Sequence, residues 1–509
     1  MENPFAEGEN RILRPPSTAI VIFGATGDLA RRKLLPALYH LYRDGFLPQK
    51  FVIIGAARRP IDDSQFVDFV AEGAREFANI DVSSSQWKEF AARLHFESVD
   101  GTDQDGFARL RKRLETFNAR DNEQYQLLYY LATSPKFFAD IAAHLDEANL
   151  IYRSSDELNR SVIVVEKPFG DDYESARELN RRLLEHFEER QIFRIDHYLG
   201  KETVQNILVF RFANGIFEPL WTREYVDHIQ ISVSEDIGVG SRAAYFDSSG
   251  ILKDIIQNHL LQMLSLLCIE PPISLSDPDS IRDEKVKVLR SIRPFSSESV
   301  MSDCVRAQYD SGFIKGKSVV GYHEESGVRE GSRTETYAAL RLEIDNWRWS
   351  GVPIYVRAGK RLPKRITELS ISFKRAPQSL FRGRQIVELD QNMLAIQVQP
   401  REGITLRMNS KPPGPRMRVG SVEMDFSYKG SFGMRSADAY ERLLLDAMKG
   451  DPTLFTRKDE IEEAWKLLKP VYEGWQTSDY PVYQYAAGTW GPTAADELLE
   501  RSGHRWRVL

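Results

Sequence analysis

The fold of the first half of this chain is decided by Thr18-Ala-Ile-Val-Ile-Phe-Gly-Ala-Thr-Gly-Asp-Leu-Ala30. The run from Thr18 to Phe23 is apolar and largely β-branched, which predicts a buried strand. A glycine turn follows, and the residues from Arg31 to Arg43 have a helical pattern. Strand, glycine turn and helix in this order leave free N–H groups that can hold a pyrophosphate, as in dinucleotide-binding folds. The spacing G-x-x-G-x-x-A is a weak signal alone, because many strand–helix turns need glycine.

Two arginines, Arg58 and Arg59, follow the next predicted strand, Phe51 to Ile54. A protein that selects NAD usually has an acid at this place, which holds the ribose 2′-hydroxyl. A guanidinium group instead suits a 2′-phosphate. The pair therefore favours NADP, and the alternative is that both arginines are simply solvated ahead of Pro60.

Further apolar runs, 126–131 and 161–165, predict two more strands, each followed by a helical pattern. The second run ends in Glu166-Lys167-Pro168-Phe169-Gly170. Lys167 then stands at the carboxyl end of a parallel strand, where ligands bind in such sheets, although a turn lysine would look the same. Residues from about 15 to 195 thus indicate a Rossmann-like, doubly wound parallel sheet.

A chemically unusual stretch follows, Arg194-Ile-Asp-His-Tyr-Leu-Gly-Lys-Glu-Thr-Val-Gln-Asn206. It lies where the α/β pattern gives way to a β-rich one, so we predict two domains, 1–195 and 196–509. Such boundaries favour ligand pockets, although a surface loop with mixed charges is the alternative. If the stretch is extended, Asp196 and His197 point in opposite directions.

The pattern after this boundary begins with a run, 204–212, that could be a helix or a strand. Residues 227–235 alternate as a half-buried strand that ends at Glu235, and residues 254–267 have a helical period. At 100° per residue, His259 projects among aliphatic side chains of that helix. From spacing alone, a satisfied core histidine is favoured over a catalytic one.

Closely spaced alternating runs then predict a large, mainly antiparallel sheet, because parallel strands need long crossovers. The runs are 336–344, 352–357, 368–373, 394–398, 405–408 and 422–428. Residues 357–365 form a dense basic turn, which is either solvated or a positive field for an anionic substrate. Two predicted helices, 437–449 and 459–468, close this α+β core.

Composition limits the class of protein. The chain has 509 residues, hydrophobic content of 42% and a net charge of −6, which indicate a soluble multidomain protein with no general attraction to nucleic acid or anionic membrane. The N-terminus lacks the apolar core of a signal peptide, and no run is long and apolar enough to span a bilayer. The two cysteines, Cys268 and Cys304, have no metal-type spacing and fit a reducing cytosol. We expect a cytoplasmic protein with no metal ion.

Taken together, these motifs resemble the glucose-6-phosphate dehydrogenase family over nearly the whole chain and in the family's order. The blocks that carry the resemblance are Gly24–Ala30, Glu166–Gly170, Arg194–Asn206, Gly250–Met263, Arg357–Lys360 and Gly491–Asp496. The resemblance implies oxidation of glucose 6-phosphate at C1 with hydride transfer to NADP, and a homodimer or homotetramer.

The resemblance also implies a role for each matching residue. His259 corresponds to the general base and Asp196 to the carboxylate that orients it. The family's residues around the substrate match these positions of this chain: Lys167, His197, Tyr198, Lys201, Glu235, Asp254, Lys360 and Arg365. The residues of the coenzyme site correspond to Gly24, Ala25, Thr26, Gly27, Asp28, Leu29, Ala30, Arg31, Arg58 and Lys167. His197, Tyr198 and Lys201 would hold the phosphate.

Two other functions stay open at this point. A different pyridine-nucleotide sugar oxidoreductase is one, because a Glu-Lys-Pro turn after a strand also occurs in other Rossmann families. An NADP-sensing protein with an inactive site is the second. Substitutions of Lys201 and His259 discriminate between these alternatives.

Overall fold

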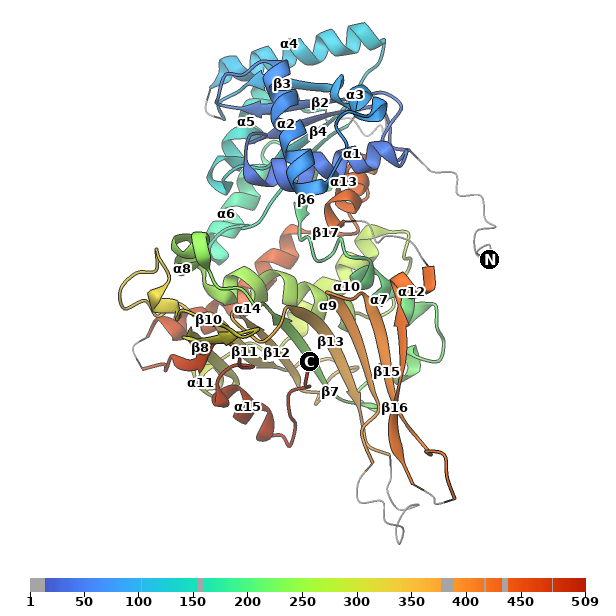
Figure 1. Ribbon diagram of the computed structural model, residues 1–509, viewed down its shortest axis with the longest axis vertical. Helices are drawn as coiled ribbons and strands as arrows, with labels where there is room; N and C mark the ends of the chain where they lie inside the picture. Colours follow the sequence, from blue (N-terminus) through green and yellow to red (C-terminus); the bar gives the residue numbers. More distant parts are fainter. Residues whose placement is uncertain are drawn as a thin grey trace. The chain divides into compact units, whose positions relative to one another are not determined.

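The computed structural model describes residues 14–101, 103–152, 160–376, 389–415, 418–432, 438–477 and 479–509 (Figure 1). The chain forms two compact units. The first comprises Met1–Gly170, Glu174–Gly200 and Ala437–Lys458, and the second comprises Asp171–Tyr173, Lys201–Ser436 and Asp459–Leu509. Among the described helices, none combines the length and the apolar character that crossing a bilayer requires.

The first unit is built on a parallel sheet in the order β3-β2-β1-β4-β5-β6. Its strands are β1 (Thr18–Phe23), β2 (Phe51–Ala57), β3 (Leu94–Ser98), β4 (Gln126–Leu131), β5 (Ser161–Val165) and β6 (Ile192–Ile195). Every residue of β1, β4 and β5 is buried, as expected of strands covered on both faces. The order reverses between β1 and β4, so the predicted doubly wound sheet is confirmed.

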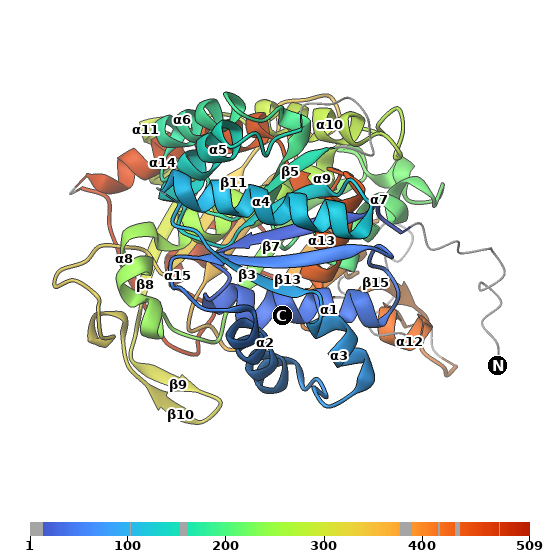
Figure 2. The ribbon, with the colours of Figure 1, turned by 90° about the horizontal axis from the view of Figure 1, so that it is seen from above.

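Helices cover both faces of this sheet (Figure 2). One face carries η1 (Ala30–Leu34), α1 (Leu35–Arg43), α2 (Asp63–Ala78) and α3 (Ser85–Ala91). The other carries α4 (Gln104–Asp121), η2 (Pro135–Phe137), α5 (Phe138–Glu147) and α6 (Tyr173–Leu184), and η3 (Glu189–Gln191) precedes β6. Local signals set their ends: α2 starts at a capping box of Asp62 and Gln65 and ends at Asn79 in the left-handed conformation.

A segment from late in the chain completes the first unit. The short strand β17 (Phe455–Thr456) pairs antiparallel with β6, and the rings of Phe193 and Phe455 meet edge to face at 4.7 Å. Helix α13 (Ala439–Lys449) packs on α1, where the imidazole of His40 and the carboxylate of Glu441 lie 2.8 Å apart. The observed division therefore differs from the predicted 1–195 and 196–509. A two-residue strand has no periodicity, and its pairing is not local, so the sequence pattern does not reveal this return.

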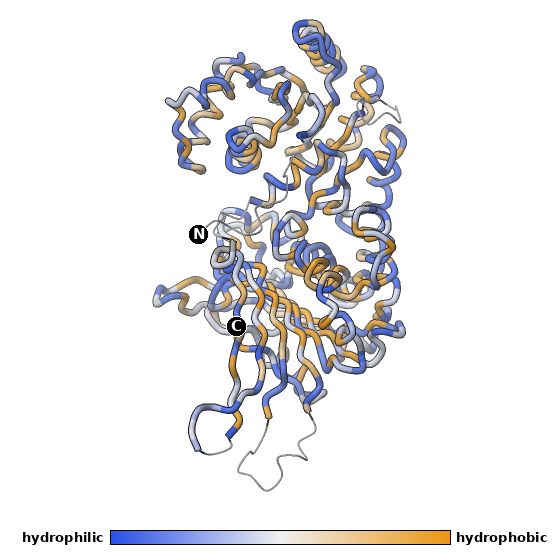
Figure 3. The backbone as a smooth tube through the Cα atoms, turned by 90° about the vertical axis from the view of Figure 1, so that its right-hand side faces the viewer, coloured by the Kyte–Doolittle hydropathy of each residue, from blue (hydrophilic) through white to orange (hydrophobic). Residues whose placement is uncertain are grey.

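The second unit is built on a nine-stranded sheet in the order β16-β15-β14-β13-β7-β12-β11-β8-β18. Its strands are β7 (Val226–Ser234), β8 (Cys304–Asp310), β11 (Tyr337–Leu342), β12 (Ile354–Gly359), β13 (Ile366–Phe373), β14 (Met393–Gln399), β15 (Gly403–Ser410), β16 (Gly420–Ser427) and β18 (Tyr483–Ala486). The pairs β7–β12 and β8–β18 are parallel and the others antiparallel, which confirms the predicted mainly antiparallel sheet. Hydrophobic runs follow its middle strands (Figure 3). A separate hairpin joins β9 (Gly312–Ile314) and β10 (Lys317–Val319).

The helices of the second unit include α7 (Glu202–Phe212), which settles the open assignment of 204–212 as helical. The predicted helix 254–267 is also present, but in two parts, a π-helix η6 (Leu252–Leu260) and an α-helix α9 (Leu261–Cys268). Helix η6 packs on β7 and β12, and α7 packs on α9. The other helices are η4 (Glu218–Leu220), η5 (Gly240–Arg242), α8 (Ala243–Ile251), α10 (Pro278–Ser291), α11 (Ser297–Asp303), η7 (Tyr322–Glu324), α12 (Tyr428–Phe432), α14 (Lys458–Gln476) and α15 (Thr493–Glu500).

Candidate active site

The glycine turn lies at the point where the strand order of the first unit reverses. Gly24 has a φ of +81°, and a Cβ on it would lie 2.3 Å from the carbonyl oxygen of Ala132, just after β4. The N–H of Gly24 donates to the carbonyl oxygen of Ala56 at 2.8 Å, and this bond holds the turn against the end of β2. Only glycine fits here, and the turn leaves room for a ligand beside its backbone. Gly27, Asp28, Leu29 and Ala30 continue directly into η1, so the predicted strand–turn–helix order is present.

A cleft of about 640 Å³ opens beside this turn. It is lined by Phe23, Gly24, Thr26, Gly27, Ala56, Ala57, Arg58, Arg59, Val99, Asp100, Gly101, Ala132, Thr133, Phe137 and Ile141. Both predicted arginines stand at the carboxyl end of β2 and are exposed. The donor set of backbone N–H groups and two guanidinium groups fits a pyrophosphate and a 2′-phosphate.

Arg31, also predicted to contact the coenzyme, is engaged elsewhere in the first unit. Its Nη2 lies 3.0 Å from Glu76 and 3.5 Å from Glu72, both on α2. Its guanidinium also lies over the ring of Phe69 at 5.4 Å. Arg31 therefore joins η1 to α2, and it is not among the residues that line the cleft.

Lys167 follows β5 at the carboxyl edge of the same sheet, as expected. The preceding Glu166 accepts a hydrogen bond from the hydroxyl of Tyr130 at 2.5 Å, and burial raises the pKa of its carboxyl group. Tyr130 is itself fully buried on β4. The Glu166–Tyr130 contact thus fixes the backbone from which Lys167 projects.

Asp196, His197 and Tyr198 follow β6 directly. Asp196 is 2% exposed, and its Oδ1 accepts the N–H of Tyr198 at 2.9 Å, while its carbonyl accepts the N–H of Leu199 at 3.0 Å. The segment after Asp196 is therefore a turn, so the condition under which Asp196 and His197 would point in opposite directions, an extended segment, is not met. An Asp side chain that closes a turn on its own backbone explains the difference, because such bonds compete with extended structure.

Three predicted substrate residues meet at one edge of the sheet in the second unit. Glu235 directly follows β7, Lys360 directly follows the parallel neighbour β12, and Arg365 precedes the antiparallel neighbour β13. The Nζ of Lys360 donates to Oε2 of Glu235 at 2.5 Å, and Lys360 is only 7% exposed. Arg365 is exposed and donates to Gln399 at 3.3 Å. Lys360 is thus held in a partly buried ion pair, whereas the guanidinium group of Arg365 is exposed.

The π-helix η6 carries two further predicted residues, Asp254 and His259. His259 is fully buried, as the sequence pattern indicated, and Asp254 is half-buried. A π-helix does not follow the 100° spacing assumed for this segment, so the predicted neighbours of His259 rest on the wrong helix type. Single π turns inside helices occur frequently at functional sites. Lys201 immediately precedes α7 and is half-buried.

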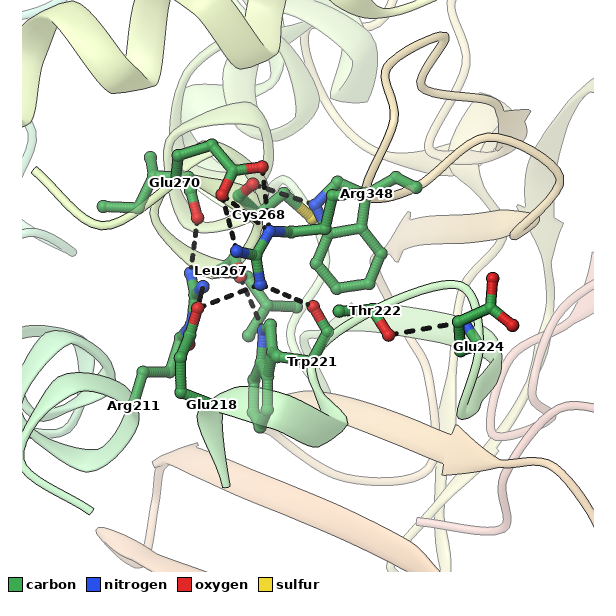
Figure 4. A network of polar contacts seen from close by, with 11 residues as sticks. Arg211, Glu218, Trp221, Thr222, Glu224, Leu267, Cys268, Glu270 and Arg348 are labelled. Atoms are coloured by element: carbon green, nitrogen blue, oxygen red, sulfur yellow. Dashed lines mark hydrogen bonds and ion pairs between the residues drawn. The ribbon is translucent and has the colours of Figure 1, made fainter. Parts of the chain in front are cut away.

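A buried polar network ties the far ends of α7 and α9 together (Figure 4). Arg211 on α7 is fully buried and donates to the carbonyls of Leu267 and Ile269 at 3.0 and 2.9 Å. Trp221 donates to Leu267 at 2.8 Å, and Glu218 bridges Arg211 and Arg348. The last carbonyls of α9 therefore have donors, although burial still lowers the pKa of the Arg211 guanidinium.

Asp227, His228 and His504 form a cluster of potential metal ligands in the second unit, with ligand atoms within 4.8 Å of one another. Oδ2 of Asp227 lies 2.8 Å from Nδ1 of His228 and 3.1 Å from Nε2 of His504. Gln230 accepts the N–H of Arg507 and donates to the carbonyl of Arg505, so its amide nitrogen faces Nε2 of His228. His228 must then carry its proton on Nδ1, where a metal ion would bind. The cluster fits a hydrogen-bonded anchor for the C-terminal segment.

Several residues that line the cleft beside the glycine turn were not predicted from the sequence, among them Asp100, Thr133 and Phe137. Thr133 follows β4, and Asp100 follows β3 closely. The rule that ligands bind at the carboxyl ends of parallel strands could have found both. Phe137 lies in η2, and no sequence signal distinguishes it from a core residue.

Comparison with known proteins agrees with this geometry. The model of the glucose-6-phosphate dehydrogenase NAD binding domain matches residues 21–206, and that of the C-terminal domain matches residues 208–507. Glucose-6-phosphate 1-dehydrogenase of Chlamydia pneumoniae is 45% identical over 498 residues, which cover 97% of this chain and 96% of the relative. That of Aggregatibacter actinomycetemcomitans is 44% identical over 495 residues, 97% and 98% of the two chains.

Two solved structures have the same fold over the whole chain. Glucose-6-phosphate dehydrogenase in complex with its substrate glucose-6-phosphate superposes with a TM-score of 0.89 at 35% identity, covering 97% of this chain and 99% of the other. Glucose-6-phosphate 1-dehydrogenase from Mycobacterium avium gives a TM-score of 0.81 at 37% identity, with the same coverage. The chain therefore belongs to the glucose-6-phosphate dehydrogenase family, oxidoreductases that pass a hydride from glucose 6-phosphate to NADP.

Proposed function

We propose that His259 removes the C1 hydroxyl proton of glucose 6-phosphate and that Asp196 orients its imidazole. The chain oxidises glucose 6-phosphate at C1 to 6-phosphoglucono-1,5-lactone, the first step of the oxidative pentose phosphate pathway. Bound NADP supplies the hydride acceptor. The observation that carries the assignment is a fully buried imidazole on a helix that packs against β7 and β12, whose ends present Glu235 and Lys360.

The chemistry explains why these residue types suit the reaction. A neutral imidazole with a pKa near 7 can take the hydroxyl proton as the hydride leaves, and such a base contributes about 10²–10⁴-fold to the rate. A carboxylate beside it holds the reactive nitrogen free and stabilises the imidazolium, as an Asp does in hydrolase triads. That is the role we assign to Asp196.

The substrate phosphate carries about two negative charges, and we assign His197, Tyr198 and Lys201 to hold it. Cationic and hydroxyl donors together distinguish the phosphorylated sugar from free glucose. The residues that we assign to the sugar are Lys167, Glu235, Asp254, Lys360 and Arg365. Lys360 comes with Glu235 already in contact, so both side chains are fixed before a ligand binds.

The first unit binds NADP in this proposal, and the second binds the substrate. The glycine turn would meet the pyrophosphate with backbone N–H groups, and Arg58 would bind the 2′-phosphate. Arg58 and Arg59 occupy the cleft wall at the end of β2, where a protein selective for NAD usually has an acid. This supports NADP over NAD as the coenzyme.

Formation of NADPH, followed by absorbance, tests the proposal. The wild-type chain should reduce NADP with glucose 6-phosphate and not with glucose. Lys201→Ala should raise the KM for glucose 6-phosphate by about 10–100-fold, the value of a charge-assisted hydrogen bond, while Lys411→Ala on an exposed loop should not. An unchanged KM in Lys201→Ala would refute the phosphate assignment.

Coenzyme choice is tested with Arg58→Ala. Removing a guanidinium that binds only the 2′-phosphate should raise the KM for NADP by about 10-fold or more and leave that for NAD nearly unchanged. Equal effects on the two coenzymes would contradict the role of Arg58.

The proposal includes a homodimer or homotetramer in the cytoplasm. The edge strand β16 is exposed along most of its length, with Val422 and Met424 exposed by 43% and 57%, and an uncovered edge strand invites pairing with another chain. Cys268 and Cys304 are both buried free thiols, which supports a reducing compartment. Light scattering after gel filtration tests the assembly, and a monomeric mass would contradict it.

A further inference from the structure

The helix that carries His259 begins at an irregular point in the backbone. Gly250 has φ +69° and ψ 170°, so α8 is broken there and the helix restarts at Ile251 and Leu252. The first N–H groups of a helix have no partner within it. Here Glu335 accepts two of them: the N–H of Ile251 donates to its carbonyl at 3.0 Å, and the N–H of Leu252 donates to its Oε1 at 3.1 Å. A residue far away in sequence thus caps the start of η6.

Gly250 is what allows the carboxylate of Glu335 to come so close. A Cβ on Gly250 would lie 2.2 Å from Oε1 and 2.7 Å from Cδ of Glu335. Backbone conformations of this kind are essentially restricted to glycine. The break in α8 and the cap by Glu335 are therefore two parts of one arrangement.

Glu335 is itself held from both sides. The hydroxyl of Thr334 donates to the carbonyl of Asp247 on α8 at 2.7 Å, and the N–H of Thr336 donates to Ala307 on β8 at 2.9 Å. The N–H of Lys360 donates to the carbonyl of Thr336 at 3.0 Å. The backbone around Glu335 therefore joins the start of η6 to the turn that presents Lys360.

The carboxylate of Glu335 is buried, with 9% of the residue exposed, and burial raises its pKa to about 7. Hydrogen bonds from backbone N–H groups, that of Leu252 among them, oppose that rise in pKa, and so do the charges of Arg306 on β8 and Lys253 on η6. Lys253 also lies over the ring of Tyr472 on α14 at 4.1 Å. An acceptor at the N-terminus of a helix is favourable because the helix dipole is positive there.

We propose that Glu335 is a positioning residue for the reaction, because it fixes where η6 begins and so the direction in which His259 points. A π turn closes its hydrogen bonds one residue later than an α turn (i→i+5 against i→i+4), so a change in where the π segment begins changes the direction in which the residues after it project, His259 among them. The proposal rests on the proposed function, in which His259 is the general base. It assigns no contact between Glu335 and the substrate.

Steady-state kinetics of three variants test this inference. Glu335→Met keeps the length of the side chain but removes the acceptor, and should lower kcat by about 10–100-fold, with the KM for glucose 6-phosphate within about 3-fold of wild type. Glu335→Gln restores an acceptor oxygen and should recover kcat to within about 3-fold. The matched control is Glu368→Met, which removes another buried carboxyl with a raised pKa, the partner of Arg507, and should leave kcat unchanged.

A wild-type kcat in folded Glu335→Met would overturn the inference, and so would an equal loss in folded Glu368→Met. If Glu335→Met does not fold, Gly250→Ala decides, because its Cβ displaces the carboxylate without removing it. Failure of the proposed function is distinguishable, since His259→Asn would then keep wild-type turnover. Loss of turnover in His259→Asn with none in Glu335→Met or Gly250→Ala would refute only the positioning role.

Discussion

The two ends of the helical segment that carries His259 are held in different ways. At its start, Glu335 supplies one carboxylate oxygen and one carbonyl, and burial raises the pKa of that carboxyl to about 7. At its finish, Arg211 and Trp221 donate to the last carbonyls of α9, and Glu218 balances the charge of Arg211. One end is thus held by two acceptors of a single residue, and the other by a network of donors.

The two ends are joined to His259 by different types of helix. The stretch from the start of η6 to His259 is a π-helix, whereas the stretch after it is α-helical. A π segment is rare and depends on contacts outside the helix, whereas an α-helix keeps its register through its own hydrogen bonds. We therefore expect the start of η6 to control the rate of reaction and the end of α9 to control the stability of the fold.

The largest expected effect is at the residue that both ends hold. His259→Asn should lower kcat by about 10²–10⁴-fold, because the proton then has no base, while the KM for NADP should hardly change. The control is His323→Asn, because His323 is an exposed histidine of the same unit, and this substitution should leave kcat unchanged. Wild-type turnover in His259→Asn would show that His259 is not the general base.

Arg211→Met should destabilise the C-terminal end of α9 without changing the rate of hydride transfer. Removing one partner of a buried ion pair destabilises a protein by about 3–5 kcal/mol, because Glu218 and the carbonyls of α9 lose their donor. The free energy of unfolding and Tm should fall, while kcat below the transition stays within about 3-fold of wild type. A large fall in kcat at unchanged Tm would show that this end also sets the direction of His259.

Gly250→Ala should affect the start of η6 through both strain and a clash. The backbone conformation costs a residue with a side chain about 1–3 kcal/mol, and the Cβ would meet the carboxylate of Glu335. Gly331→Ala is the matched control, because Gly331 has a φ of +68° with no atom within 4 Å of its Cβ position. Gly250→Ala should lower both Tm and kcat, and Gly331→Ala only Tm. Equal kcat in the two variants would contradict the role of the Glu335 contact.

The smallest effect is on the pH dependence of stability. Burial raises the pKa of Glu335 from 4.5 to about 7, so the folded chain binds more protons than the unfolded chain between these values, and stability falls as pH rises through that window. The slope is at most about 1.4 kcal/mol per pH unit. Glutamine does not titrate, so Tm of wild type minus Tm of Glu335→Gln should decrease from pH 5 to pH 7. A constant difference would show that Glu335 ionises at its ordinary pKa.

Much of the first unit could be predicted from the sequence because its signals are local. The apolar run Thr18–Phe23, the glycines at 24 and 27 and the arginines at 58 and 59 follow one another in the order that a dinucleotide-binding sheet requires. The resemblance alone grouped Glu235 with Lys360 around the substrate. In the structure the Nζ of Lys360 and Oε2 of Glu235 lie 2.5 Å apart.

Other features depend on contacts between distant parts of the chain and left no local signal. Strand β17 is two residues long and pairs with a strand far earlier in the sequence. The π-helix has the same apolar residues that an α-helix would have, so periodicity assigned the commoner type. Glu335 stands in Thr334-Glu335-Thr336 before a strand, where a charged residue is ordinarily solvated, and only the structure shows that it caps η6.

The most direct test that the start of η6 controls the reaction rate is the single-turnover rate of NADPH formation in Glu335→Met. It is measured beside Arg211→Met at saturating glucose 6-phosphate and NADP. This rate excludes substrate binding and product release. Glu335→Met should form NADPH about 10–100-fold more slowly than wild type, and Arg211→Met should keep the wild-type rate. A wild-type rate in Glu335→Met, or a matching loss in folded Arg211→Met, would contradict this prediction.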